Sequence, residues 1–350
     1  MDIKKCLKLA VKLNASDLHF IVSSPVYVRI DGKLLPLHSV SSFPKSNLNN
    51  KDLETMVSDI LNNEQLKKLQ FKRDLDFGVS IDDLRFRVNF SFERGNFKVA
   101  IRTISNVQPS LEEIGMPEVV SDLLKSKQGL ILITGPAGCG KSTTLAAMIN
   151  HINQTRKDHI VTLEDPIEYI FKPEKSLIAQ RQLGDDMLTF ASGLRHVLRQ
   201  DPNVIMIGEM RDLETISTAV TVAETGHLVL GTLHTYSASQ TIDRIIDVFP
   251  AHQQNQIKAQ LSIVLKAVIS QRLLPKKGKG RAAAREIMIK NDAIANLIRE
   301  GKVAQIKSII ETGAYLGMST FEKHVKELYE SNQIDLETAT SYVSKDYILD

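Results

Sequence analysis

This chain of 350 residues is poor in cysteine, in excess charge and in long apolar runs, and each scarcity excludes a class of protein. Its two cysteines, Cys6 and Cys139, are too few for a disulfide framework or a four-cysteine zinc site, which predicts a reduced, cytoplasmic protein. A formal net charge of +3 is too small to indicate a nucleic-acid partner. The longest apolar runs, such as residues 129–133 and 228–233, are too short for a transmembrane segment, and the amphipathic N-terminus does not resemble an export signal.

The length and the pattern of the chain predict two domains joined by a linker. In the first domain, residues 1–103, we expect helices at 7–13 and 52–68, two strands within 26–37 that turn at Asp31-Gly32, and a surface loop at 39–50. A polar, proline-containing segment, residues 104–110, is the expected linker. The second domain, residues 111–350, alternates helical segments with short apolar strands at 130–133, 160–163, 204–207 and 228–233. That alternation predicts an α/β fold with a mostly parallel sheet and helices on both faces.

Residues 84–104 have the alternating pattern of a β-hairpin. If the hairpin closes on residues 93–96, three apolar pairs face each other: Phe92 with Phe97, Phe90 with Val99 and Val88 with Ile101. The same register sets Arg87 opposite Arg102. Like charges directly opposite each other destabilise a sheet, so these arginines either bind an anion or splay into solvent. We take anion binding as the hypothesis to test.

The most informative motif is a phosphate-binding loop of the form G-x-x-x-x-G-K-[ST]. It comprises Gly135, Pro136, Ala137, Gly138, Cys139, Gly140, Lys141 and Ser142, and Thr143 follows it. An apolar run precedes the loop and a segment of helix formers follows it, which is the strand-loop-helix context that the motif requires. Backbone N–H groups and the helix N-terminus can surround phosphates, Lys141 adds a positive charge, and Ser142 can hold Mg²⁺. The sequence therefore predicts a site for ATP and Mg²⁺.

Two acidic segments follow buried strands and are candidates for the chemistry of that nucleotide. Glu209 lies just past one strand, at the edge where open α/β sheets bind ligands, so its carboxylate can hold a Mg²⁺-bound water or polarise the attacking one. Its alternative role is that of an acid at the N-terminus of the next helix. Glu164, Asp165 and Glu168 follow another strand, and Pro166 disfavours a helix there. These acids can coordinate metal and position water, or they form a solvated turn.

Two histidines bracket the apolar strand at 228–233. His234 follows the C-terminal end of the strand, where an imidazole can donate to the γ-phosphate or to Glu209 and so sense the nucleotide state. His227 precedes the strand, and for it a packed or surface position is an equal alternative. A zinc site is not expected, because no cysteine is nearby and the histidines lie at opposite ends of the strand.

A basic cluster occupies residues 276–281. It lies between a segment expected to form an apolar helix, residues 263–274, and a strand-like segment at 282–289. The cluster is expected to be a solvated loop, and a surface for an acidic partner is the alternative.

Several of these motifs together resemble the secretion-superfamily ATPases and, within them, the type IV pilus retraction (twitching-motility) ATPases. The similar segments are the acidic box at 163–168, the strand acid at 208–212, the histidine box at 223–235, and residues 15–19, 85–89, 241–250 and 267–271. The resemblance therefore runs over most of the chain. The C-terminal signature at 293–300 departs from the retraction family, because Ala295 stands where the family has an arginine. That departure bears on the coupling of hydrolysis to the pilus more than on hydrolysis itself.

The resemblance implies a homohexameric ring that hydrolyses ATP to power pilus retraction. Each subunit would have a PAS-like α+β N-terminal domain and a RecA-like ATPase domain with a C-terminal helical region, and nucleotide would bind between them. The arginine fingers of the family match Arg87, Arg94 and Arg102 of this chain. The implied partners are an inner-membrane pilus platform protein and a paralogous retraction ATPase, at the inner face of the cytoplasmic membrane.

Other functions remain open at this point. Pilus-extension and type II secretion ATPases usually carry a longer N-terminal region and a four-cysteine zinc insert, and this sequence has neither. A non-hydrolysing partner subunit that binds nucleotide is disfavoured by the intact Lys141, Glu209 and His234. A nucleic-acid translocase is disfavoured by the small excess of positive charge.

Overall fold

The computed structural model describes residues 3–30, 32–81, 84–104, 107–278 and 280–349. The chain divides into two compact units, Met1–Val107 with Glu168–Ile170, and Gln108–Ile167 with Phe171–Asp350. Among the described residues, no helix has both the length and the apolar character that crossing a bilayer requires.

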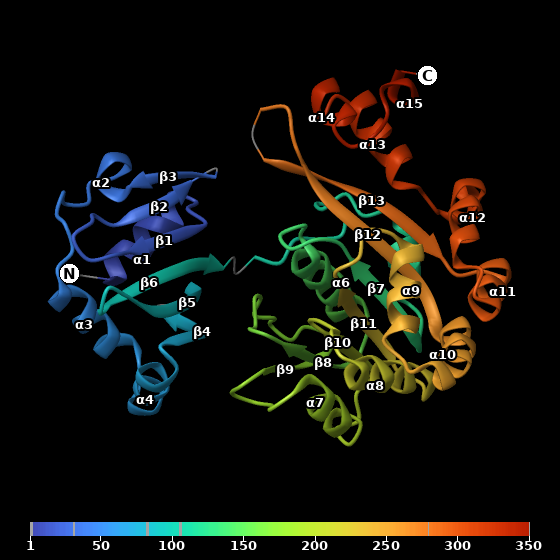
Figure 1. Ribbon diagram of the computed structural model, residues 1–350, viewed down its shortest axis with the longest axis horizontal. Helices are drawn as coiled ribbons and strands as arrows, with labels where there is room; N and C mark the ends of the chain where they lie inside the picture. Colours follow the sequence, from blue (N-terminus) through green and yellow to red (C-terminus); the bar gives the residue numbers. More distant parts are fainter. Residues whose placement is uncertain (1–2, 31, 82–83, 105–106, 279, 350) are drawn as a thin grey trace. The chain divides into compact units, whose positions relative to one another are not determined.

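The first unit is built on an antiparallel sheet of six strands in the order β3-β2-β1-β6-β5-β4 (Figure 1). The strands are β1 (Asp17–Phe20), β2 (Tyr27–Ile30), β3 (Lys33–Pro36), β4 (Asp74–Ile81), β5 (Leu84–Glu93) and β6 (Asn96–Ile104). The helices are α1 (Ile3–Lys12), α2 (Leu37–Val40), α3 (Asn50–Ile60) and α4 (Asn63–Lys72). Phe86, Val88 and Phe90 of β5 are fully buried and share one core with apolar residues of α1 and α3.

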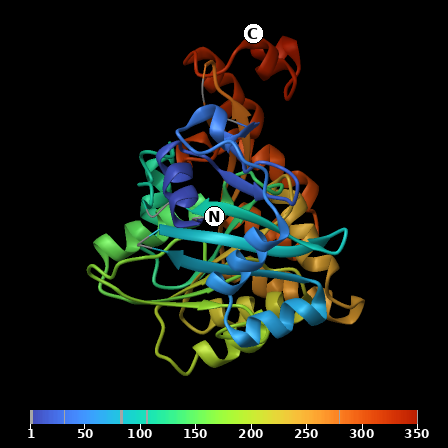
Figure 2. The same cartoon turned by 90° about the vertical axis from the view of Figure 1, so that its left-hand side faces the viewer.

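The hairpin predicted at 84–104 is confirmed in its register. Strands β5 and β6 run side by side in both views (Figure 1; Figure 2), and Phe92 pairs with Phe97, Phe90 with Val99, Val88 with Ile101 and Arg87 with Arg102. Arg94 and Gly95 connect the strands with φ angles of 49° and 81°, the left-handed conformation that a two-residue hairpin turn favours.

Three other segments of this unit refine the expectations. The strands at 26–37 are confirmed as β2 and β3, while Asp31 of the expected turn lies outside the described residues. The expected loop at 39–50 begins within α2. The stretch at 52–68, expected to be one helix, is divided between α3, which ends at Ile60, and α4. Asn62 caps α4, because the side chains of Asn62 and Gln65 each accept from the backbone N–H of the other residue.

The second unit holds a seven-stranded sheet in the order β13-β12-β7-β11-β10-β8-β9, parallel except for the edge strand β13 (Figure 1). Its strands are β7 (Gly129–Thr134), β8 (His159–Glu164), β9 (Leu177–Gln182), β10 (Val204–Ile207), β11 (Leu228–Leu233), β12 (Leu265–Pro275) and β13 (Arg281–Ile289). Its helices are α5 (Glu118–Leu123), α6 (Lys141–Thr155), α7 (Phe190–Val197), α8 (Leu213–Glu224), α9 (Ala238–Asp247), α10 (Ala251–Val264), α11 (Asp292–Glu300), α12 (Ile306–Thr312), α13 (Phe321–Glu330), α14 (Leu336–Thr340) and α15 (Lys345–Leu349), with short 3₁₀ turns at Val303–Gln305 and Ala314–Leu316.

The central strands are buried on both faces, which explains their mostly apolar sequences. Every residue of β7, β10 and β11 is buried. Leu130 and Leu132 of β7 pack in one core with apolar residues of α7 to α10. Ile131 and Ile133 alternate with them and point to the opposite face. The parallel sheet predicted from the sequence is confirmed, with β10 and β11 at the residues expected.

One sequence prediction in this unit is wrong. The segment expected to be an apolar helix, 263–274, is mostly strand: α10 ends at Val264 and β12 begins at Leu265 without an intervening turn. The strand lies between β7 and β13, so its side chains are buried by neighbours far away in the sequence. The strand expected at 282–289 is confirmed as β13. The basic cluster follows β12, and its last residue, Arg281, begins β13, while residue 279 lies outside the described residues.

Candidate nucleotide-binding site

The phosphate-binding loop lies between β7 and α6, at the carboxyl edge of the parallel sheet. Gly135 begins it with a φ of 142°, and a Cβ built there would lie 2.3 Å from the backbone oxygen of Gln271. Only glycine fits so close to a neighbouring strand. Gly140 ends the loop in the left-handed conformation and forms the N-cap of α6. The N-terminal N–H groups of that helix, with the positive end of its dipole, therefore follow directly on the loop.

Lys141 folds back over the loop. Its Nζ donates hydrogen bonds to the carbonyl oxygens of Gly135 at 2.7 Å and Pro136 at 3.0 Å. Ser142 and Thr143 are half-buried in the first turn of α6, whereas Ala137 and Gly138 are exposed at the tip of the loop. The loop thus has a buried base and an open rim beside its lysine.

Residues that follow two other strands lie at the same edge of the sheet as the loop. Leu233 of β11 pairs with Thr134 of β7, so His234 follows where Gly135 begins the loop. Glu209 lies just beyond β10, whose last residue Ile207 is the neighbour of both β8 and β11. The sheet therefore brings the loop, Glu209 and His234 to one edge, as the sequence predicts for an open parallel sheet.

Charged side chains at this edge form an ion pair and contribute to the pKa shift of His234. The Glu209 carboxylate accepts from the guanidinium of Arg211 at 2.7 Å, with the Arg211 side chain largely exposed. Partial burial of the His234 ring, followed by the positive charges of Lys141 and Arg211, lowers the pKa of His234, and Glu209 opposes the shift. The His234 imidazole is accordingly neutral at neutral pH, with one nitrogen that donates and one that accepts. Sequence reasoning gave no role to Arg211, although it lies two residues from Glu209.

The acidic box at 163–168 divides between the two units. Glu164 ends β8 and is buried, where its carboxylate accepts from the Thr162 hydroxyl at 2.6 Å and the Gln180 side-chain amide at 3.1 Å. Glu168 is half-buried and begins the segment Glu168–Ile170, which groups with the first unit. In the described part of the chain, no three acidic, histidine or cysteine side chains are grouped so as to hold a metal ion.

His227 lies at the opposite edge of the sheet from His234. The six residues of β11 separate them, so their Cα atoms lie about 23 Å apart at the rise of a strand. The His227 ring lies 3.2 Å from the carbonyl oxygen of Val222 and 3.3 Å from the Thr225 hydroxyl, at the end of α8. The structure therefore does not bring His227 to the phosphate-binding loop.

The facing arginines of the first unit each have a carboxylate partner. Arg87 makes a bidentate pair with Asp76 on β4, with a shortest distance of 2.6 Å, and Nε of Arg102 donates to Asp17 on β1 at 2.9 Å. The repulsion expected from their register is thus offset within the sheet, without an external anion. Burial of the Asp17 carboxyl raises its pKa, but hydrogen bonds from Ser16 and Arg102 outweigh burial and lower it. Arg94 lies at the tip of the hairpin with its side chain 90% exposed.

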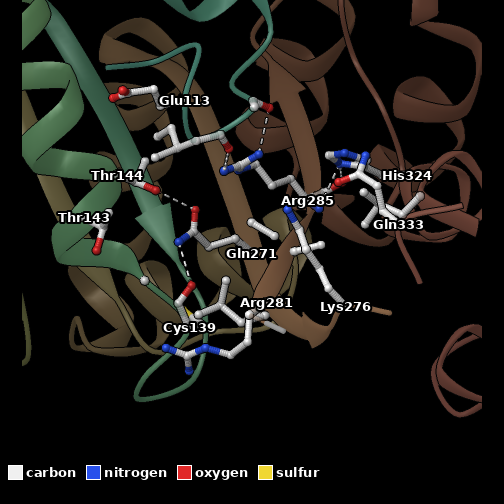
Figure 3. Close-up of a pocket in the computed structure, with 18 of the residues that line it drawn as sticks. Glu113, Cys139, Thr143, Thr144, Gln271, Lys276, Arg281, Arg285, His324 and Gln333 are labelled. Carbon is white, nitrogen blue, oxygen red and sulfur yellow. Dashed lines mark hydrogen bonds between the residues drawn. The ribbon is translucent and has the colours of Figure 1, made fainter. Parts of the chain in front are cut away.

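Two residues of the β12–β13 hairpin that were missed from the sequence lie beside the loop (Figure 3). Gln271 on β12 contacts both the loop and α6. Arg285 on β13 is buried and donates to the backbone oxygens of Ile114 at 2.6 Å and Gly115 at 2.9 Å. Burial lowers the pKa of Arg285 to about 10. Both residues, with Thr143 and Thr144, line a cavity of about 720 Å³ next to the loop.

A parallel sheet with this loop after one strand and an acid past another defines a P-loop nucleoside triphosphatase of RecA-like architecture. The family described as "Type II/IV secretion system protein" matches residues 1–346, and the chain belongs to it. The chain is 46% identical over 341 residues to the type IV pilus retraction ATPase PilT of Pseudomonas aeruginosa, covering 97% of both proteins. It is 48% identical to a twitching motility protein of Neisseria gonorrhoeae over 83% of this chain and 78% of that protein.

A solved structure of the pilus retraction motor PilT with bound ADP superposes on this chain with a TM-score of 0.90. The two sequences are 44% identical, and the match covers 97% of this chain and 96% of that one. The fold class predicted from the sequence, a PAS-like α+β domain followed by a RecA-like P-loop ATPase domain, is confirmed. The predicted resemblance to the secretion-superfamily ATPases is confirmed as well.

Proposed function

We propose that this chain is an ATP-hydrolysing motor that powers type IV pilus retraction. The observation that carries the proposal is the placement of Lys141, Glu209 and His234 at one sheet edge, in a chain similar to PilT over nearly its whole length. The proposed domains are those expected from the sequence: an N-terminal domain at residues 1–103, a linker at 104–110, and an ATPase domain with a C-terminal helical region at 111–350. The break between Val107 and Gln108 supports that division, although residues 105 and 106 of the linker lie outside the described residues.

The loop would bind the phosphates of ATP, and the adjoining cavity has room for the nucleoside. Lys141 would exchange its carbonyl partners for phosphate oxygens, a stronger hydrogen bond because both partners are charged. Mg²⁺ is held mainly by phosphates, water and one or two protein oxygens, so the Ser142 hydroxyl and the Glu209 carboxylate suffice as protein ligands. The exposed Arg211 side chain can leave Glu209 when the metal binds. Mg²⁺ would neutralise the charge that develops on the phosphates.

The carboxylates and His234 would act on the attacking water. Glu209 is the candidate to polarise it, because it lies at the ligand edge and is only half-buried. A neutral His234 can accept or donate next to Glu209 and so report the γ-phosphate. Glu164 accepts hydrogen bonds from Thr162 and Gln180 and is better suited to shaping the turn than to exchanging protons. Glu168 is proposed as a water-positioning acid.

Arg87, Arg94 and Arg102 are proposed as the arginines that neutralise charge at the nucleotide of this or a neighbouring subunit. The Asp76 partner of Arg87 does not prevent this role. A half-exposed ion pair contributes about 1 kcal/mol or less, which binding to a phosphate can replace. His227, remote from its own loop, is proposed to act at the ring interface, where a neighbouring subunit would approach it.

The assembly that fits these roles is a homohexamer at the inner face of the cytoplasmic membrane. Its proposed partners are the pilus platform protein and a paralogous retraction ATPase, and nucleic acid is not a proposed partner. Ala295, which replaces the arginine of the retraction signature, is buried in α11, so position 295 offers little surface to a partner in this chain. Coupling to the pilus would therefore depend on other residues of the C-terminal helices.

Steady-state phosphate release by the purified full-length protein tests the enzymatic part of the proposal. Turnover should exceed that of Lys141→Ala by at least two orders of magnitude, because that variant loses the charge that meets the terminal phosphates. Turnover equal to the variant would instead favour a non-hydrolysing partner subunit. The direction of the motor is tested by gene deletion: excess surface pili support retraction, and loss of pili would identify an extension ATPase.

A further inference from the structure

The Gln271 side chain joins three elements that surround the phosphate-binding loop. Its Nε2 donates to the carbonyl oxygen of Cys139 in the loop at 2.8 Å, and its Oε1 accepts from the hydroxyl of Thr144 on α6 at 2.9 Å. Gln271 and Thr144 are each 2% exposed. Figure 3 shows both hydrogen bonds, one from each end of the Gln271 amide, which lies between Cys139 and Thr144.

The orientation of this amide is fixed by chemistry. A peptide carbonyl can only accept a hydrogen bond, so the atom of Gln271 that faces Cys139 must be the nitrogen. The oxygen then faces Thr144, whose hydroxyl has a proton to donate. The backbone of Gln271 is fixed as well, since Ser270 pairs with Thr134 of β7 and their hydroxyls hydrogen-bond at 2.8 Å.

Holding the Cys139 carbonyl also orients the next N–H. In a trans peptide the C=O and N–H bonds point in opposite directions, so a carbonyl that is held toward β12 turns the N–H of Gly140 away from β12. That N–H belongs to the set with which a loop of this type surrounds phosphate oxygens. Gly140 itself adopts the left-handed conformation, which glycine tolerates.

We propose that Gln271 is a positioning residue for nucleotide binding, which acts by holding the Cys139–Gly140 peptide so that the Gly140 N–H faces the phosphates. The inference rests on the proposed function of the loop. In this proposal, the Gln271 side chain, which lies outside the motif, orients a backbone N–H within the motif. Thr144 keeps the Gln271 amide from flipping.

The first test measures equilibrium binding of a fluorescent N-methylanthraniloyl ADP with Mg²⁺ to the full-length protein. Gln271→Met keeps the side-chain volume but has no proton to donate to the Cys139 carbonyl. Its dissociation constant for the ADP probe should rise about 10- to 100-fold, the value of one hydrogen bond to a charged group. Binding within twofold of the wild type would overturn the proposal.

The second test separates proton donation from packing. In Gln271→Glu, the ionised carboxylate cannot donate to Cys139, whereas the protonated carboxyl can donate there and still accept from Thr144. The ratio of wild-type to variant affinity should therefore be large at pH 8 and shrink as the pH falls toward 6. A ratio that is flat across this range would show that only packing matters and would refute the inference.

Two controls keep the result interpretable. If Gln271→Met has no cooperative thermal transition, the test is made with Thr144→Val and Thr144→Ser instead. The valine variant should bind the ADP probe more weakly than the wild type, and the serine variant should bind it equally well. Equal binding by the two variants refutes the inference. Phosphate release by the wild type and Lys141→Ala is measured in parallel. Absence of wild-type turnover would refute the proposed ATPase, while the binding titrations would still test Gln271.

Discussion

The ion pair between Arg87 and Asp76 allows the catalytic and the structural roles of Arg87 to be separated. Its side chains are 34% and 37% exposed, so solvent screens the pair and its loss should reduce the free energy of unfolding by about 1 kcal/mol or less. For a domain of about 100 residues, a loss of 1 kcal/mol corresponds to about 4–8 °C in melting temperature. Arg87→Gln and Asp76→Asn break the same pair and should lower the melting temperature by similar amounts.

Turnover should distinguish the two variants. An arginine that neutralises charge in phosphoryl transfer is worth about 10³- to 10⁵-fold in kcat. We therefore expect Arg87→Gln to lose at least three orders of magnitude in steady-state phosphate release, with ADP binding to the loop retained. Asp76→Asn leaves the guanidinium in place and should keep at least half of the wild-type turnover.

The opposite result would refute this reasoning. If both variants lose turnover equally, Arg87 acts only through the sheet, and if neither loses it, Arg87 has no role in hydrolysis. Arg102 and its partner Asp17 provide a second matched pair, on the neighbouring strand. Wild-type turnover in both Arg87→Gln and Arg102→Gln would exclude these arginines from the nucleotide chemistry altogether.

Three further predictions concern the second unit. Gly135→Ala should weaken binding of the fluorescent ADP at least tenfold, because its Cβ would meet the Gln271 backbone oxygen at 2.3 Å; wild-type affinity would contradict this. Burial raises the pKa of the Cys139 thiol, so iodoacetamide at pH 8 should leave it unmodified in the folded protein, as peptide mass spectrometry can check. Burial also raises the pKa of Glu286, which accepts from the Ala238 N–H, so its stabilisation is present at low pH and lost as pH rises through the raised value. Glu286→Gln should therefore raise the melting temperature at pH 8 and not near pH 4, and an effect independent of pH would contradict the assignment.

The parts of the fold that the sequence predicts well are those whose pattern records local geometry. Strand β10 is a continuous apolar run and β11 is a largely apolar one, and parallel strands buried on both faces favour such runs. The β5–β6 register follows from alternation and a two-residue turn, which together leave one way to pair the apolar face. Loop, acid and histidine could be placed at one edge because each follows a strand of the same parallel sheet.

The parts that the sequence did not predict depend on distant contacts. The carboxylate partners of Arg87 and Arg102 come from β4 and β1, and nothing near the arginines in sequence indicates them. The break at Asn62 is different, since Asn62 and Gln65 form a capping pair that could have been recognised. The region 263–274 has no helix breaker, and an apolar run of this kind fits a buried strand as well as a helix. Pairing with β7 and β13 decides the outcome.

That error concealed Gln271. Glu209 and His234 can be predicted from the sequence because each is a polar residue that follows a buried strand of the parallel sheet. Ser270 and Gln271 interrupt the apolar sequence of β12 beside Thr134, the last residue of β7. Once the segment is known to be a strand, they are therefore also polar residues at the edge of the sheet where the loop lies. If the segment is taken to be a helix, as the sequence predicts, nothing places Gln271 at that edge of the sheet. A phosphate-binding motif specifies which backbone N–H groups can turn toward an anion, but the neighbouring strand decides where they point. Outside its own motif, the loop should therefore be most sensitive to substitution at Gln271, which follows Ser270 on that strand.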